Sequence, residues 1–180
     1  MNLNFYKYQG TGNDFVMIDN RSKTFKKHNI DLISKLCDRH FGIGADGIIL
    51  IENAKEFDFR MLYFNADGSE TFCGNGGRCA TAFAKHLNII GDSAHFIAVD
   101  GVHFATIENH IVSLKMIDVD DIQVQENSVF VFTGTQHHVE LVENLDTYPV
   151  FENGKNIRYS YKDPGSNVNF VAQVNNATFR

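Results

Sequence analysis

The feature that most constrains this chain is the run from Asn65 to Cys79, which reads Asn-Ala-Asp-Gly-Ser-Glu-Thr-Phe-Cys-Gly-Asn-Gly-Gly-Arg-Cys. It follows an apolar strand pattern and leads into a helical pattern of small residues. Glycine lets the backbone turn sharply and approach a ligand closely. The first N–H groups of a helix lack intrahelical partners and, with the helix dipole, attract an anion. The run therefore predicts an anion pocket with a reactive sulfur, Cys73, at its edge.

The three cysteines have different surroundings in the sequence. Cys37 and Cys79 lie on the apolar sides of helical patterns, where a free cysteine acts as a small buried hydrophobe. Cys73 lies among glycines and polar residues at a predicted helix start, a position that activates thiols. From this pattern alone both a structural and a functional role stay open for Cys73, because short motifs also match by chance. No Cys-x-x-Cys spacing is present, so we expect no metal.

Length and charge narrow the class of protein. A chain of 180 residues suits one large domain or two small ones. Its net charge of -6, without a block of like charges, argues against nucleic acid or an anionic membrane as the main partner. The sequence shows no signal-peptide pattern and no apolar run of transmembrane length. These features and the odd number of cysteines predict a cytoplasmic protein whose thiols stay reduced.

Hydrophobic periodicity predicts a sheet-rich first part with two helices. Asn29 is a good N-cap for the first helix, and the second, over Gly76 to Leu87, carries small residues typical of burial within a sheet or barrel. Gln9 to Asp14 is expected to form a polar loop. The expected strands are Leu3 to Tyr8, Phe15 to Ile18, Ile48 to Ile51, Phe57 to Phe64, Phe96 to Val99, Val102 to Ile107 and Ile111 to Ile117. Two helices are too few to connect parallel strands throughout, so we predict α+β rather than doubly wound α/β.

The acidic stretch from Val119 to Asn127 is the best candidate for a domain boundary. It predicts a first domain over residues 1–117 and a second over residues 118–180. Beyond the boundary, Val150 to Tyr161 has no clear period. Strands are expected at Val129 to Phe132, Val139 to Val142 and Asn167 to Val174.

Several motifs, spread in order along the entire chain, resemble those of the diaminopimelate epimerases. They are Gly12-Asn13-Asp14-Phe15, the segment from Asp38 to Gly47, the segment from Phe64 to Glu70, Cys73-Gly74-Asn75-Gly76-Gly77-Arg78-Cys79, the segment from Thr133 to Val139, and the segment from Asn167 to Val171. The resemblance implies a cofactor-independent isomerase that inverts one α-carbon of L,L-diaminopimelate to give the meso form, a precursor of lysine and peptidoglycan. It also implies two pseudo-symmetric lobes, each a β-barrel-like sheet around a central helix.

The resemblance also implies residue roles. Cys73 would be one of two thiols that move the α-proton, and His137 would be auxiliary. Substrate binding is implied for the residues that match the family's positions, Asn13, Asn65, Gly74, Asn75 and Asn167. An α-proton beside a carboxylate is only weakly acidic, so hydrogen bonds aimed at that carboxylate are needed. A turn or capping role remains the alternative for each asparagine, and a structural role for His137.

One departure from the family is consequential. The family's second catalytic cysteine has no match here, since neither Cys37 nor Cys79 corresponds to it. We therefore expect one lobe and part of a second, with little or no epimerase activity from this chain alone. A homodimer, favoured by exposed strand edges, or a second polypeptide would complete it. The alternatives are a non-catalytic ligand-binding or assembly module and a related racemase or isomerase on the same fold.

Overall fold

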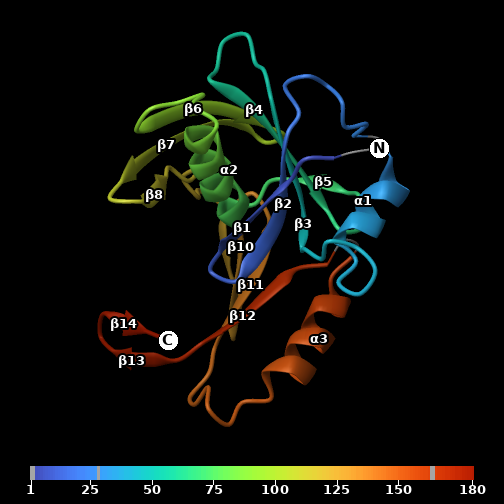
Figure 1. Ribbon diagram of the computed structural model, residues 1–180. Helices are drawn as coiled ribbons and strands as arrows, with labels where there is room; N and C mark the ends of the chain where they lie inside the picture. Colours follow the sequence, from blue (N-terminus) through green and yellow to red (C-terminus); the bar gives the residue numbers. More distant parts are fainter. Residues whose placement is uncertain (1–2, 28, 163–164) are drawn as a thin grey trace. The chain divides into compact units, whose positions relative to one another are not determined.

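The computed structural model describes residues 3–27, 29–162 and 165–180, and the chain forms two compact units, Met1–Met116 and Ile117–Arg180 (Figure 1). The elements of the first unit are β1 (Tyr6–Gly10), β2 (Asn13–Asp19), α1 (Ile30–Cys37), β3 (Gly47–Glu52), β4 (Phe59–Asn65), β5 (Glu70–Thr71), α2 (Gly74–His86), β6 (Ser93–Ala98), β7 (Gly101–Glu108) and β8 (Ile111–Leu114). Its sheet has the order β1-β2-β3-β4-β6-β7-β8, and β5 pairs with β4.

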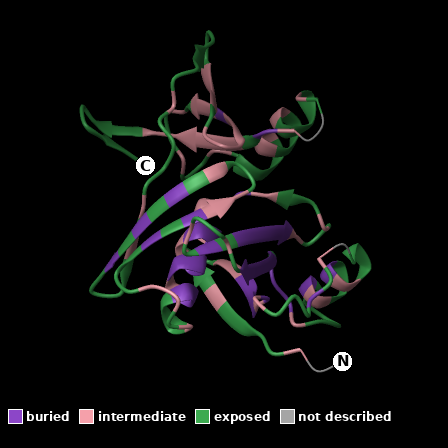
Figure 2. Cartoon of the chain, turned by 90° about the horizontal axis from the view of Figure 1, so that it is seen from above, coloured by how far each residue is buried: buried purple, intermediate pink, exposed green. Residues whose placement is uncertain are grey.

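Strand β3 lies at the centre of the first unit, and every residue of it is buried. Ile49 and Ile51 face the apolar cluster that contains α2, whereas Ile48 and Leu50 face the cluster that contains α1. Successive side chains of a strand point to opposite faces, so a strand covered on both faces is apolar throughout. Figure 2 shows this buried centre, and the run Ile48 to Ile51 is confirmed as a buried strand.

Helix α2 packs against the curled sheet, and its predicted burial is confirmed. Ala80, Phe83 and Ala84 have no exposed surface. The first turn approaches the sheet so closely that a Cβ at Gly76 would lie 3.1 Å from Ile49 Cδ1. The helix begins at Gly74, two residues earlier than the periodicity predicts, with Cys73 as its N-cap.

The elements of the second unit are β9 (Ile122–Val124), β10 (Ser128–Phe132), β11 (Gln136–Leu141), α3 (Val150–Ser160), β12 (Asn167–Val171), β13 (Gln173–Asn175) and β14 (Thr178–Phe179). Its main sheet has the order β12-β11-β10-β9, and α3 packs against β12. Helix α3 was not predicted, since none of its residues is buried and no apolar stripe marks it. In neither unit does a described helix have the length and apolarity needed to cross a membrane.

The expectation that helices do not connect parallel strands is wrong. Strands β2 and β3 are parallel and joined through α1, β4 and β6 through α2, and β11 and β12 through α3. One helix is sufficient to carry the chain back to the starting edge of a sheet. The other strand pairs are antiparallel, so the main sheet of each unit is mixed. The predicted α+β class is confirmed.

The tight polar loop expected at Gln9 to Asp14 is present as a hairpin turn that is shorter than expected. Gly10 pairs with Asn13, which leaves Thr11 and Gly12 alone in the turn, with φ of 54° and 85°. Two positive φ values in succession match the right-handed twist of the flanking strands. The hairpin fixes Asn13 as the first residue of β2.

Candidate active site

Cys73 stands where β5 passes into α2, with an extended backbone at φ -136° and ψ 123°. Its side chain is half-buried. The helix turn that follows is Gly74-Asn75-Gly76, whose N–H groups have no intrahelical acceptors. The thiol therefore borders a helix start, which favours an anion such as a carboxylate.

Asn13 lies directly beside this thiol. The Cys73 Sγ–H donates to Asn13 Oδ1 at 3.4 Å, and Asn75 Nδ2 donates to the same oxygen at 3.4 Å. Three of the residues singled out in the sequence thus meet around one atom. They come from two elements, β2 and the first turn of α2.

The side chains of both asparagines also form hydrogen bonds on the side that faces away from Cys73. Asn13 Nδ2 donates to Asp46 Oδ2 at 2.6 Å. Asn75 Oδ1 accepts from the guanidinium of Arg78, one turn further along α2, and from Thr11 Oγ1 at 3.2 Å. The amides at this site are therefore firmly oriented.

The side chain of Asn65 forms hydrogen bonds with residues that are close to it in the sequence. Its Oδ1 accepts from the Tyr63 hydroxyl at 2.8 Å, and its Nδ2 donates to Ser69 Oγ and Thr71 Oγ1, both at 3.0 Å. These bonds stabilise the turn between β4 and β5, the alternative role that the sequence left open. Substrate binding by Asn65 stays a prediction.

Cys37 and Cys79 are core residues, as predicted, with exposed fractions of 3% and 4%. Burial raises the pKa of each thiol to about 11, because the charged thiolate loses its hydration. At neutral pH both stay protonated.

His137 and Asn167 form a group within the second unit. They are register partners on β11 and β12. Thr135 Oγ1 contacts His137 Nε2 at 3.1 Å and accepts from Asn167 Nδ2 at 3.4 Å. Asn169 Nδ2, which as an amide nitrogen only donates, lies 3.1 Å from His137 Nδ1. Asn167 is exposed and His137 half-buried.

Named proteins from other organisms are similar to this sequence over nearly its whole length. The profile of the family described as Diaminopimelate epimerase matches residues 5–101. The diaminopimelate epimerase of Flavobacterium psychrophilum is 55% identical over 98% of this chain and 71% of its own length. This chain belongs to the diaminopimelate epimerase family. The diaminopimelate epimerase of Aquifex aeolicus is 36% identical, over 99% of this chain and 72% of its own length.

Solved structures with low sequence identity show that the fold of this family member recurs in other proteins. A phenazine biosynthesis protein of the PhzF family from Bacillus anthracis matches 97% of this chain and 68% of its own, with a TM-score of 0.71 at 14% identity. A hydroxyproline epimerase from Agrobacterium vitis matches 98% of this chain and 68% of its own, with a TM-score of 0.66 at 12% identity. The family makes the chain an isomerase, and these solved structures share its α+β fold.

Two charged residues at the site of this family member were not singled out from sequence. Asp46 and Arg78 stand at the two ends of the amide pair Asn13 and Asn75. Both lie inside motifs that resemble those of the family, and this position was the sequence signal that could have identified them. His138, the neighbour of His137 on β11, is buried with Nδ1 2.8 Å from the Tyr161 hydroxyl. Among the described residues, no group of three or more His, Cys, Asp or Glu side chains is arranged to hold a metal ion.

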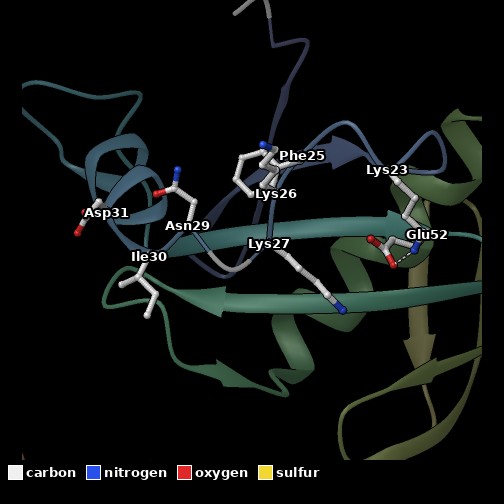
Figure 3. Close-up of a pocket in the computed structure, with 8 residues that line it drawn as sticks. All are labelled: Lys23, Phe25, Lys26, Lys27, Asn29, Ile30, Asp31 and Glu52. Carbon is white, nitrogen blue, oxygen red and sulfur yellow. Dashed lines mark hydrogen bonds and ion pairs between the residues drawn. The ribbon is translucent and has the colours of Figure 1, made fainter.

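The first unit also contains a hollow of about 680 Å³ near the start of α1 (Figure 3). Its described lining residues are Lys23, Phe25, Lys26, Lys27, Asn29, Ile30, Asp31 and Glu52, none of them a predicted site residue. The buried Glu52 carboxylate pairs with Lys23 and accepts from Asn20 Nδ2 at 2.7 Å. Its charge is therefore satisfied within the protein.

Proposed function

We propose that this chain acts in the epimerisation of L,L-diaminopimelate to the meso form, with Cys73 as one of two acid/base groups. Family membership and 55% identity to a protein named diaminopimelate epimerase support the reaction. The observation that carries the role of Cys73 is its place at the start of α2, in hydrogen-bonding contact with Asn13.

In the proposed reaction the Cys73 thiolate takes the α-proton from one face and becomes a thiol. A second acid gives a proton to the opposite face, so one C–H bond breaks, another forms, and the configuration inverts. No electron is gained or lost overall, and no cofactor is needed. The negative charge that develops passes into the adjacent carboxylate, which the N–H groups of Gly74 and Asn75 would bind.

Three further side chains, those of Asn13, Asn65 and Asn167, are proposed to bind polar groups of the substrate, and His137 is proposed to have an auxiliary role. Asn13 and Asn65 belong to the first unit, whereas His137 and Asn167 belong to the second. Each makes hydrogen bonds within its own unit. Substrate would compete for the bonds of the three asparagines, so truncating each of them should raise KM more than it lowers kcat.

The opposite-face group is neither Cys37 nor Cys79, because both thiols are buried and protonated. We propose that this group comes from outside residues 1–180, and a homodimer or a second polypeptide is one source of it. We also propose a cytoplasmic location, where Cys73 would stay reduced.

The test is incubation of the purified chain with L,L-diaminopimelate in deuterium oxide, followed by mass spectrometry and chiral separation. We expect deuterium at the α-carbon, and we expect Cys73→Ala to abolish its incorporation. Cys37→Ala serves as the matched control, because that thiol is buried elsewhere.

The stereochemical outcome then shows whether protons are transferred on one face of the α-carbon or on both. Meso product with label means that a second acid is present, and dependence on protein concentration would point to a second copy. Exchange without inversion means that Cys73 works on one face only. No exchange by a folded chain would contradict the proposal and favour a ligand-binding module.

A further inference from the structure

Four side chains of the first unit, from Arg78 to Asp46, form a hydrogen-bonded chain in which each residue donates to the next. The Arg78 guanidinium donates to Asn75 Oδ1, and Asn75 Nδ2 donates to Asn13 Oδ1 at 3.4 Å. Asn13 Nδ2 donates in turn to Asp46 Oδ2 at 2.6 Å. Arg39 holds the other oxygen of Asp46 at 2.8 Å.

The charged ends of this chain determine which way each amide faces. A guanidinium can only donate and a carboxylate can only accept, whereas an amide does both. Asp46 therefore draws the Nδ2 of Asn13 toward itself and leaves Oδ1 on the far side. That oxygen is the atom that accepts from the Cys73 thiol at 3.4 Å.

We propose that Asp46 is a positioning residue that acts through Asn13 to keep the proton on Cys73 until substrate arrives. An acceptor beside the sulfur stabilises the thiol, because only the thiol has a proton to donate. A donor in its place would stabilise the thiolate instead. The inference rests on the proposed role of Cys73 as an acid/base.

Other titratable groups around Cys73 do not supply this control. Tyr63 on β4, Tyr8 on β1 and Cys79 on α2 pack in the same apolar cluster. Burial raises the pKa of all three, so they are neutral at pH 7. The charge of Arg78 is directed at Asn75 Oδ1.

Asp46→Asn tests the proposal. The Arg39 guanidinium is charged, whereas the Asp14 backbone N–H that donates to Oδ2 at 3.2 Å is not, so Arg39 would draw the new amide oxygen and residue 46 would present its N–H to Asn13. Asn13 would then turn over, which breaks its 3.4 Å contact with Asn75 and places Nδ2 against Cys73 Sγ. We expect iodoacetamide to alkylate Cys73 about three- to tenfold faster at pH 7, because the free energy of one hydrogen bond changes the thiolate fraction by about that factor. The pH profile of alkylation should move to lower pH.

Asp14→Asn is the matched control. It removes the same charge from the same cluster, but the Asp14 carboxylate bonds Arg39 and Lys7 and not the side chain of Asn13. We expect less than a twofold change in the Cys73 alkylation rate. Equal acceleration in both variants would mean a general charge effect and would overturn the proposal.

Asn13→Ala supplies the second comparison. It removes the mediator, so adding Asp46→Asn to this variant should change the Cys73 alkylation rate no further. Additive effects of the two substitutions would overturn the proposal. Circular dichroism checks the folding of each variant, and Asp46→Ala, which also frees the Asn13 amide, replaces Asp46→Asn if that variant does not fold.

Alkylation requires no substrate, so the two proposals fail separately. A chain that lacks α-proton exchange but shows the Asp46 effect contradicts the proposed reaction alone. A chain that exchanges the α-proton but shows no Asp46 effect contradicts the positioning role alone.

Discussion

Cys73 Sγ lies 3.4 Å from Asn13 Oδ1, although 60 positions separate the two residues in the chain. Two segments of the chain make this contact possible. The hairpin at Thr11 and Gly12 places Asn13 at the start of β2, and the β5 strand ends two residues before Cys73. The half-buried thiol at a helix start is the one that the fold leaves accessible, and the other two cysteines are buried.

Alkylation should therefore separate the cysteines of the native protein. At pH 8, a thiol with a pKa of about 11 is roughly 0.1% thiolate, and both Cys37 and Cys79 are also shielded from reagent. We expect iodoacetamide to modify Cys73 at least about tenfold faster than either, as measured by peptide mass spectrometry. Addition of urea should equalise the rates, and equal rates without urea would contradict the burial.

Asp14 should stabilise the fold in a pH-dependent way. The Arg39 guanidinium, 2.8 Å from its Oδ1, and Lys7 hold the pKa of the Asp14 carboxyl well below its usual range. A depressed pKa in the folded state stabilises the protein above the unfolded-state pKa of about 3.9 and loses this effect as the pH falls.

We expect Asp14→Asn to lower the free energy of unfolding at pH 7 by less than about 1 kcal/mol, because Arg39 is largely solvent-exposed and its charge is screened. Urea denaturation at pH 7 and pH 3 measures the effect, and the difference between variant and wild type should shrink at pH 3. A difference that grows on acidification would contradict the ion-pair cause.

Phe83 should be essential to the packing of α2. Its side chain has no exposed surface, and its ring centroid lies 5.0 Å from that of Tyr6. Phe83→Ala should lower the free energy of unfolding by about 3–5 kcal/mol, because it leaves a cavity in the core. Phe41→Ala is the control, since Phe41 is 96% exposed and should cost below about 0.5 kcal/mol. Similar losses in both variants, measured by denaturant titration, would contradict this packing.

The predicted N-cap of α1 is confirmed, because Asn29 Oδ1 accepts from the Leu32 N–H at 3.0 Å. Asn29→Ala should lower the free energy of unfolding by about 1 kcal/mol. Asn29→Asp retains the acceptor and should restore most of that loss. Thermal denaturation of the three proteins provides the comparison, and an equal loss with aspartate would show that the cap does not contribute.

Local sequence patterns were sufficient to predict capping and burial wherever these depend on residues that are near in the sequence. The cap at Asn29, the buried strand at Ile48 to Ile51 and the apolar positions of Cys37 and Cys79 each follow from spacing within one element. The motif around Cys73 marked a helix start for the same reason. Periodicity failed at α3, where no face is buried and no apolar stripe could form.

The sequence by itself determined most elements of the first unit, the family motifs and which cysteine is chemically distinctive. Only the tertiary structure decided that Asn13 meets Cys73, and that Asp46 and Arg78 orient the amides around it. It also decided that helices join parallel strands. The physical reason is that periodicity records which side of an element is apolar. Strand order and the direction of a hydrogen-bonded chain depend on residues that are distant in sequence and come together only when the sheet forms.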